Sequence, residues 1–202
     1  ISGGIHRGVA SNLKDIGITE DNLLISATHT HSGPSAFFPY LSFNLPSSIY
    51  NPSIHLFLVN QITKAVLEAY KNLKPAKLAI VFGYLDKTTR NRSLAAHLAN
   101  YGIDIKVGEE CDPSMAPGGY ISTIDPVVLV IRVDQINEDN VLVPIGVFSN
   151  FAIHGTLLKN DNLYYSGDNQ AAAERFVEEG ILKIALEEGL SFKERNRIVC
   201  VW

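Results

Sequence analysis

Cysteine is scarce in this sequence, which has only Cys111 and Cys200 among its 202 residues. Two cysteines cannot form the disulfide framework that staples small secreted domains, and the sequence does not say whether they pair. Cys111 falls in a segment rich in proline and glycine. Cys200 falls in the apolar run 198–202, which predicts a central strand and a buried thiol. The cysteines therefore do not indicate whether the protein occupies an oxidising or a reducing compartment.

Long apolar runs and basic clusters are also missing. No segment approaches the roughly 20 apolar residues of a membrane-spanning helix, and the amino terminus has no signal-peptide pattern. The net charge is −4, the isoelectric point is about 5.9, and Lys and Arg are dispersed, so we expect no nucleic-acid partner. The sequence starts at Ile1 without an initiator methionine, and we expect that something was removed upstream.

The sequence has enough apolar content for a sizeable core, since 46% of its residues are hydrophobic. We therefore expect a single α/β domain over residues 1–202, with a mixed β-sheet flanked by helices. Apolar spacing and capping residues predict helices over residues 8–15, 51–73 and 169–188, with a possible break at Gly180. Apolar runs between turn residues predict strands over residues 22–27, 76–85, 126–133, 141–148 and from 198 onward.

Two features refine this outline. Segment 104–121 is rich in proline and glycine and has no apolar period, which predicts a loop-rich surface insertion. Apolar stripes predict the buried faces of the two long helices. The stripes are Ile54, Leu58, Ile62, Ala65, Ala69 and Leu73 in the first of these helices, and Ala172, Phe176, Ile181, Ile184 and Ala185 in the second.

Two histidine elements stand where strand-like runs give way to glycine-bearing loops. His29-Thr30-His31-Ser32-Gly33 follows the run 22–27, and His154-Gly155 follows the run 141–148. Open α/β sheets bind ligands at the carboxyl ends of strands, and residues two apart in an extended segment share a face. Imidazole is the commonest zinc ligand, and a catalytic zinc usually takes three protein ligands. The two histidine elements therefore predict two or three ligands of a metal site. The alternative is that these histidines are ordinary polar residues of loops.

Four motifs, in their order along the chain, resemble the neutral (alkaline, non-lysosomal) ceramidases. They are the sequences SATHTHSGP at 26–34, NRS at 91–93, NFAIHGT at 150–156 and SGDN at 166–169. The members of that family are zinc amidohydrolases that cleave the amide bond of ceramide to give sphingosine and a fatty acid. The resemblance implies a Zn²⁺ cofactor, a ceramide-like lipid amide as substrate, and a chain that forms the amino-terminal part of a longer catalytic domain.

The resemblance also implies roles for five residues. His29 and His154 correspond to zinc ligands, and His31 is expected to line the pocket beside the metal and contact substrate or hydroxide. Arg92 corresponds to an arginine that faces the active site, where a guanidinium can hydrogen-bond an oxyanion or a carboxylate; the alternative is a surface salt bridge. Asp168 is expected either to orient a ligand histidine or to cap the helix that starts near residue 169.

The sequence also departs from the family pattern. Family members have a glutamate and a tyrosine ligand far downstream of the HGT motif, and a serine in a Gly-Asp-x-Ser-Pro motif that is regarded as the nucleophile. None of these three is present in this sequence, so we expect the chain alone to be inactive. After Arg92 the sequence Leu94-Ala95-Ala96-His97 replaces the family's Pro-x-Ala-Tyr, which alters the substrate wall. Two alternatives therefore stay open: a zinc- or lipid-binding homologue without turnover, and a zinc hydrolase that acts on a different amide or ester.

The loop between residues 34 and 51 is unusually apolar. It contains Phe37, Phe38, Tyr40, Leu41, Phe43 and Leu45. Such a loop is expected to meet an acyl chain or a membrane surface, or else to pack on itself. The family resemblance further implies a secreted or cell-surface protein, whereas the oligomeric state is not readable from one chain.

Overall fold

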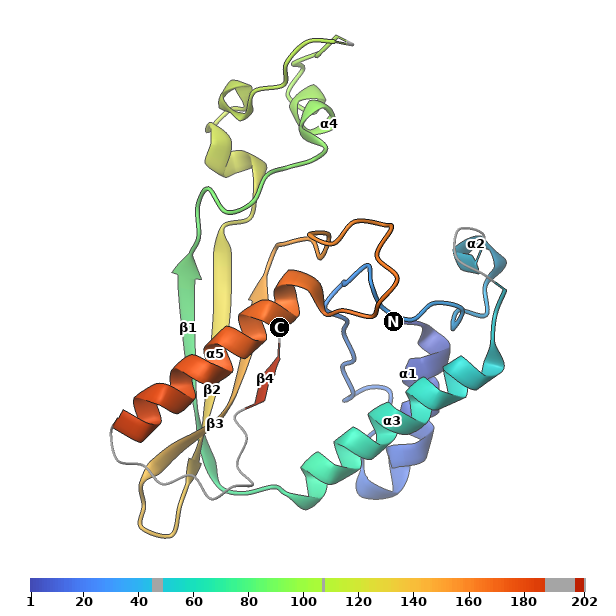
Figure 1. Cartoon of the computed structure of the whole chain (residues 1–202), viewed down its shortest axis with the longest axis vertical. Coiled ribbons are helices and arrows are strands. Elements are labelled where there is room, and N and C mark those ends of the chain that lie inside the picture. The colour runs from blue at the N-terminus through green and yellow to red at the C-terminus, as the bar shows by residue number, and fades with distance from the viewer. Residues whose placement is uncertain (45–48, 107, 188–198, 202) are drawn as a thin grey trace. The chain divides into compact units, whose positions relative to one another are not determined.

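The computed structural model describes residues 1–44, 49–106, 108–187 and 199–201 (Figure 1). The chain divides into two compact units. The first contains Ile1–Pro75 and Gly155–Ala172, and the second contains Ala76–His154 and Ala173–Trp202. Among the described helices, none combines the length and the apolar character that crossing a membrane requires.

The first unit is built on two helices that pack against each other, α1 (Gly3–Leu13) and α3 (Pro52–Lys71). The side chain of Ser2 accepts a hydrogen bond from the Ile5 amide at the start of α1, and Asn51 does the same for Ser53 at the start of α3. A short 3-10 turn, η1 (Lys14–Ile16), continues α1, and α2 (Leu41–Asn44) lies in the loop before α3. The helices predicted over 8–15 and 51–73 are thus both present, although α1 begins five residues earlier than expected.

The core of the first unit lies where α1 meets α3. Ile5, Val9, Leu13 and Val59 are buried there, and a methyl group on Gly8 would lie only 3.0 Å from Val59 Cγ2. A glycine on α1 therefore lets the two helices approach closely. The predicted stripe on α3 is wrong in its second half, because Ala65, Ala69 and Leu73 are exposed while Val59 and Thr63 are buried.

The predicted strand at 22–27 is wrong. These residues form no ladder, and the nearest strand-type pairing is the isolated parallel bridge between Thr30 and Gly155. An apolar, β-branched run becomes a strand only when a partner strand satisfies its backbone groups. Leu23 and Ile25 instead pack against the α1–α3 core.

The second unit contains a four-stranded sheet in the order β1-β2-β3-β4. The strands are β1 (Ala76–Tyr84), β2 (Val127–Ile136), β3 (Leu142–Phe151) and β4 (Val199–Val201). The first three pair in antiparallel fashion and β4 lies parallel to β3, so the sheet is mixed and the predicted α/β class is confirmed. The β2–β3 turn is organised by Asn137, whose Oδ1 accepts hydrogen bonds from the amides of Asp139 and Val141.

The long helix α5 (Asp168–Glu187) begins in the first unit and continues in the second (Figure 1). It runs through Gly180 without the predicted break, because a single glycine weakens a helix without ending it. Phe176 is 72% exposed, so its predicted inward position is wrong. Ala172 is exposed as well, and the side chains of Ile184 and Ala185 lie outside the described part of the chain.

Between β1 and β2 lie α4 (Leu94–Ala99) and the 3-10 turns η2 (Pro113–Met115) and η3 (Tyr120–Thr123). Leu94, Leu98 and Ala116 form a small buried cluster, against which the free thiol of Cys111 packs. Asp112 caps η2 by accepting a hydrogen bond from the Ser114 amide, which lowers the pKa of that carboxyl. Cys200 lies on β4, but its side chain and the flanking Ile198 and Trp202 fall outside the described residues.

Candidate metal centre

In the first unit, the backbone of the first histidine motif pairs with Gly155, the residue that follows His154. Thr30 and Gly155 form a parallel bridge, and the His31 amide donates a hydrogen bond to the Gly155 carbonyl at 3.2 Å. His154 immediately precedes Gly155 in the sequence. His154 follows the end of β3 by three residues, as the strand-end prediction requires.

Hydrogen bonds to residues 162–166 hold the first histidine motif in place. The Thr30 hydroxyl donates to the Ser166 carbonyl at 2.7 Å, and the Ser166 amide donates to the Ser32 carbonyl at 3.0 Å. Asn162 Nδ2 donates to the Ser32 hydroxyl oxygen at 3.1 Å. The loop that carries the histidines is therefore anchored through the side chains of Thr30 and Ser32.

Three imidazoles meet at this crossing. The Nε2 atoms of His29 and His31 are 3.3 Å apart, and their rings stand almost perpendicular with centroids separated by 4.8 Å. One ligand nitrogen from each of His29, His31 and His154 lies within 4.8 Å of the others. The arrangement can hold a metal ion, so His31, expected beside the metal, is placed where a third ligand can stand.

The backbone of His29 adopts an uncommon conformation, with a φ of 62° in the left-handed region. A residue other than glycine pays roughly 1–3 kcal/mol for such a backbone, and strained positions of this kind cluster at functional sites. This left-handed backbone lies at the first histidine of the motif. It is thus associated with the residue that the sequence singled out as a ligand.

The crossing of the two motifs is too tight for any side chain at Gly155. A methyl group there would lie 2.9 Å from the His29 carbonyl oxygen and 2.8 Å from Gln170 Oε1. Gln170 is 1% exposed, and its side-chain oxygen and nitrogen have no hydrogen-bond partner. Sequence reasoning missed Gln170; its one signal is that it directly follows the Ser-Gly-Asp-Asn motif.

Asp168 ties the loop after Gly155 to the start of α5. Its Oδ1 accepts hydrogen bonds from the amides of Leu157 at 3.1 Å and Asn169 at 2.7 Å, and its Oδ2 accepts one from the amide of Leu158 at 3.2 Å. The carboxylate therefore serves the first turn of the helix and also fixes the loop that leaves the His154 motif. Its predicted action on a ligand histidine stays a prediction.

Arg92 belongs to the second unit, where it is exposed in the turn before α4. The neighbouring Asn91 shapes this turn, since its Oδ1 accepts a hydrogen bond from the Ser93 amide at 2.8 Å. The expected contact of Arg92 with substrate stays a prediction.

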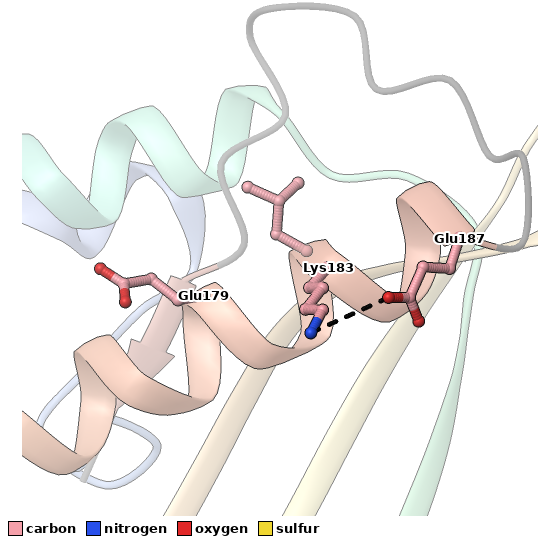
Figure 2. Close-up of a pocket in the computed structure, with 4 residues that line it drawn as sticks. Glu179, Lys183 and Glu187 are labelled. Carbon is pink, nitrogen blue, oxygen red and sulfur yellow. Dashed lines mark ion pairs between the residues drawn. The ribbon is translucent and has the colours of Figure 1, made fainter.

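A cavity of about 630 Å³ opens beside the histidine loop within the first unit. Thr30, Ser32 and Pro34 line it from the loop, Phe57 and Leu58 from α3, and Tyr165 from the segment before α5. A second pocket, of about 470 Å³, lies along α5 in the second unit and is lined by Glu179, Leu182, Lys183 and Glu187 (Figure 2). Lys183 and Glu187 form an exposed ion pair of 3.9 Å there.

The aromatic loop before α3 packs on itself and is exposed at the same time. The ring centroids of Phe37 and Phe38 are 4.5 Å apart, and those of Phe38 and Phe43 are 5.1 Å apart. Leu41 is nevertheless 76% exposed and Phe43 60% exposed. The self-packing alternative is thus confirmed for these rings, and Leu45 lies outside the described residues.

Comparison with known proteins gives a consistent result. Residues 1–192 match the sequence model of "Neutral/alkaline non-lysosomal ceramidase, N-terminal". Neutral ceramidase from Oryza sativa is 32% identical over 79% of this chain, and the match covers 18% of that protein. Neutral ceramidase from Mycobacterium tuberculosis is 33% identical over 77% of this chain, and the match covers 22% of that protein. The crystal structure of neutral ceramidase from Pseudomonas aeruginosa superposes with a TM-score of 0.72 at 27% identity, covering 98% of this chain and 27% of that one. The chain therefore spans about a fifth to a quarter of the length of these relatives.

Proposed function

Because the chain belongs to the neutral/alkaline non-lysosomal ceramidase family, a family of hydrolases, we propose that it supplies the histidine ligands of a zinc-dependent amidohydrolase. The proposed reaction is hydrolysis of the N-acyl amide of a ceramide-like lipid, which releases a sphingoid base and a fatty acid. The observation that carries the proposal is the convergence of His29, His31 and His154.

The spacing of the imidazoles supports zinc. Zn–N bonds of about 2.0–2.1 Å in a tetrahedral site place two ligand nitrogens about 3.3–3.4 Å apart. The Nε2 atoms of His29 and His31 are 3.3 Å apart, which matches the spacing of two ligand nitrogens on one zinc ion. Neutral imidazole nitrogens are also the donor type that zinc accepts in catalytic sites.

When bound, zinc supplies Lewis acidity at the amide carbonyl and lowers the pKa of a coordinated water. The residues of this chain supply the rest of the local chemistry. His29 and His154, assigned as ligands through the family resemblance, must be neutral to bind, so protonation competes with the metal. The hydrogen bonds of Thr30 and Ser32 keep the histidine loop in one conformation, which reduces the ordering needed when the ion arrives.

The cavity beside Thr30 supports a substrate with an apolar chain. Phe57, Leu58, Pro34 and Tyr165 give it carbon-rich walls, while Thr30 and Ser32 offer hydroxyl groups at the edge near the histidines. A pocket with mostly apolar walls and a few polar groups is typical of sites for amphipathic ligands. We place the acyl chain there and the amide toward the imidazoles. Substrate contact by Arg92, contact of the aromatic loop with a membrane surface, and an extracellular location remain predictions.

The test is hydrolysis of a fluorescently labelled N-acylsphingosine by the complete gene product. The enzyme is first treated with a chelator and then supplied with Zn²⁺, and His29→Ala is compared with His6→Ala. His6 is the matched control because its Nε2 bonds the Leu23 carbonyl at 2.8 Å and it is not part of the three-histidine cluster. We expect activity that returns only with Zn²⁺, is lost in His29→Ala and is kept in His6→Ala.

Two results would contradict the proposal. Equal activity in the chelated and the Zn²⁺-supplied enzyme would remove the metal from the mechanism. Zn²⁺ bound at the histidines without cleavage of the lipid would make the protein a zinc-binding homologue or a hydrolase of another amide or ester, which a panel of such substrates would then separate.

A further inference from the structure

Gln170, in the first turn of α5, is a buried polar residue of the first unit that the proposed chemistry does not use. Its side chain is 1% exposed, and neither Oε1 nor Nε2 has a hydrogen-bond partner. A carboxamide buried in this way has given up its hydrogen bonds to water without replacing them, which is uncommon in folded proteins. The residue is therefore held inside the unit despite an unfavourable local environment.

The carboxamide lies at the crossing of the two histidine motifs. A methyl group built on Gly155 would be 2.8 Å from Gln170 Oε1, 3.1 Å from its Nε2 and 2.9 Å from the His29 carbonyl oxygen. The amide and the His29 carbonyl thus approach the same α-carbon. Gly155 is also the residue that pairs with Thr30 and follows His154. The unpaired amide consequently lies beside Gly155, one residue from His154, and beside the space that the His29 carbonyl also faces.

We propose that Gln170 is a positioning residue of the metal centre. When the ion is bound, Nε2 would donate to the His29 carbonyl oxygen, and Oε1 would accept the N–H of a metal-bound imidazole that points away from the ion. Metal-ligating histidines almost always donate this outer N–H to a neighbouring oxygen, which fixes the tautomer and the ring orientation. The amide has one donor end and one acceptor end, so it matches both needs. This inference rests on the proposed function, because it requires the histidines to bind Zn²⁺.

The proposal separates the role of Gln170 in metal binding from any role in folding. Without metal the amide is unpaired, so an apolar side chain of equal length removes a penalty and adds no cavity. With metal bound the same substitution removes two hydrogen bonds from the ligand shell. Gln170→Met should therefore leave the metal-free protein as stable as before, or more stable, while it weakens the binding of Zn²⁺.

The experiment measures Zn²⁺ affinity by competition with a chromophoric chelator, and the melting temperature of the metal-free protein, in the complete gene product. Gln170→Met is compared with Gln61→Met, a control at an exposed position of α3. We expect Gln170→Met to weaken Zn²⁺ binding about 10- to 100-fold, the range found for the loss of such outer partners, without lowering the metal-free melting temperature. Gln61→Met should change neither quantity. Gln170→Glu, which keeps an acceptor oxygen of the same reach, should bind Zn²⁺ more tightly than Gln170→Met.

Each other outcome overturns the proposal. Zn²⁺ affinity within threefold of the unchanged protein would show that Gln170 does not act on the ligands. A fall in the metal-free melting temperature that accompanies weaker binding, with no recovery in Gln170→Glu, would show a purely structural role. Failure of the unchanged protein to bind Zn²⁺ would refute the metal site itself, and the role of Gln170 with it. Normal binding by the unchanged protein and by Gln170→Met would refute only the role of Gln170.

Discussion

Gly155→Ala tests how closely the two histidine motifs approach each other. The φ of Gly155 is not among the positive values in this chain, so alanine meets no backbone penalty and the cost arises from packing alone. The added methyl group would lie 2.9 Å from the His29 carbonyl oxygen and 2.8 Å from Gln170 Oε1, whereas ordinary contacts begin at 3.4 Å. The neighbours must therefore move by about half an ångström, and one of them is backbone.

Overpacking of this kind costs about 1–3 kcal/mol. In a chain of this length each kcal/mol lowers the melting temperature by roughly 2–4 °C, so we expect Gly155→Ala to melt a few degrees below the unchanged protein. Movement of the His29 carbonyl also disturbs the imidazoles, so Zn²⁺ affinity should fall as well. Urea titration of the metal-free protein measures the first effect, and chelator competition measures the second.

Gly180→Ala is the matched control. Gly180 lies inside α5, its φ is not positive, and a methyl group there meets no atom within 4 Å. Alanine should stabilise the helix by about 0.5–1 kcal/mol. If Gly155→Ala were to unfold at the same urea concentration as the unchanged protein while Gly180→Ala unfolded later, the close crossing described for Gly155 would be wrong.

Three other predictions follow from the site and its supports. His154→Ala should abolish high-affinity Zn²⁺ binding in equilibrium dialysis. Arg92→Ala should keep Zn²⁺ bound and lower the turnover of lipid hydrolysis, and release of zinc by Arg92→Ala would refute the role given to that residue. Asp168→Ala removes the acceptor of three backbone amides and should cost about 1–2 kcal/mol in urea unfolding, with no change refuting its capping role. Zn²⁺ binding should weaken on acidification, because protons compete with the metal for the imidazole nitrogens; a flat affinity between pH 8 and pH 5 would exclude histidine ligation.

The sequence predicted the elements whose signals are local. The Asn51-Pro52 start of α3 and the polar turn around Asn137 both act within a few residues, so the helix and the β2–β3 hairpin follow from the chain itself. The run 22–27 failed because strand formation depends on a partner that local sequence does not reveal. The face that α3 buries was misplaced for the same reason, since the position of α1 decides that Val59 is covered and Leu73 is not.

The candidate site likewise contains residues that the sequence predicted and a residue that only the folded structure identifies. The histidines were visible because their motifs resemble those of a known family, and the structure adds that the ligand nitrogens of all three converge. Gln170 could not be found from the sequence, because its significance lies in contact with Gly155 and no spacing rule connects the two. The tightness of that contact is likewise a property of the folded backbone alone.

The hydrogen bond between Thr30 and Ser166 has a consequence for the order of assembly, because it joins residues 136 positions apart. Closing so long a loop costs about 4 kcal/mol of chain entropy, and this cost must be met before the contact stabilises the fold. During synthesis, His29 and His31 leave the ribosome well before their partner segment exists. Helices α1 and α3, which lie close together in the sequence, can pack first. A metal ion that needs both histidine motifs would then bind in its final geometry only after this contact has formed.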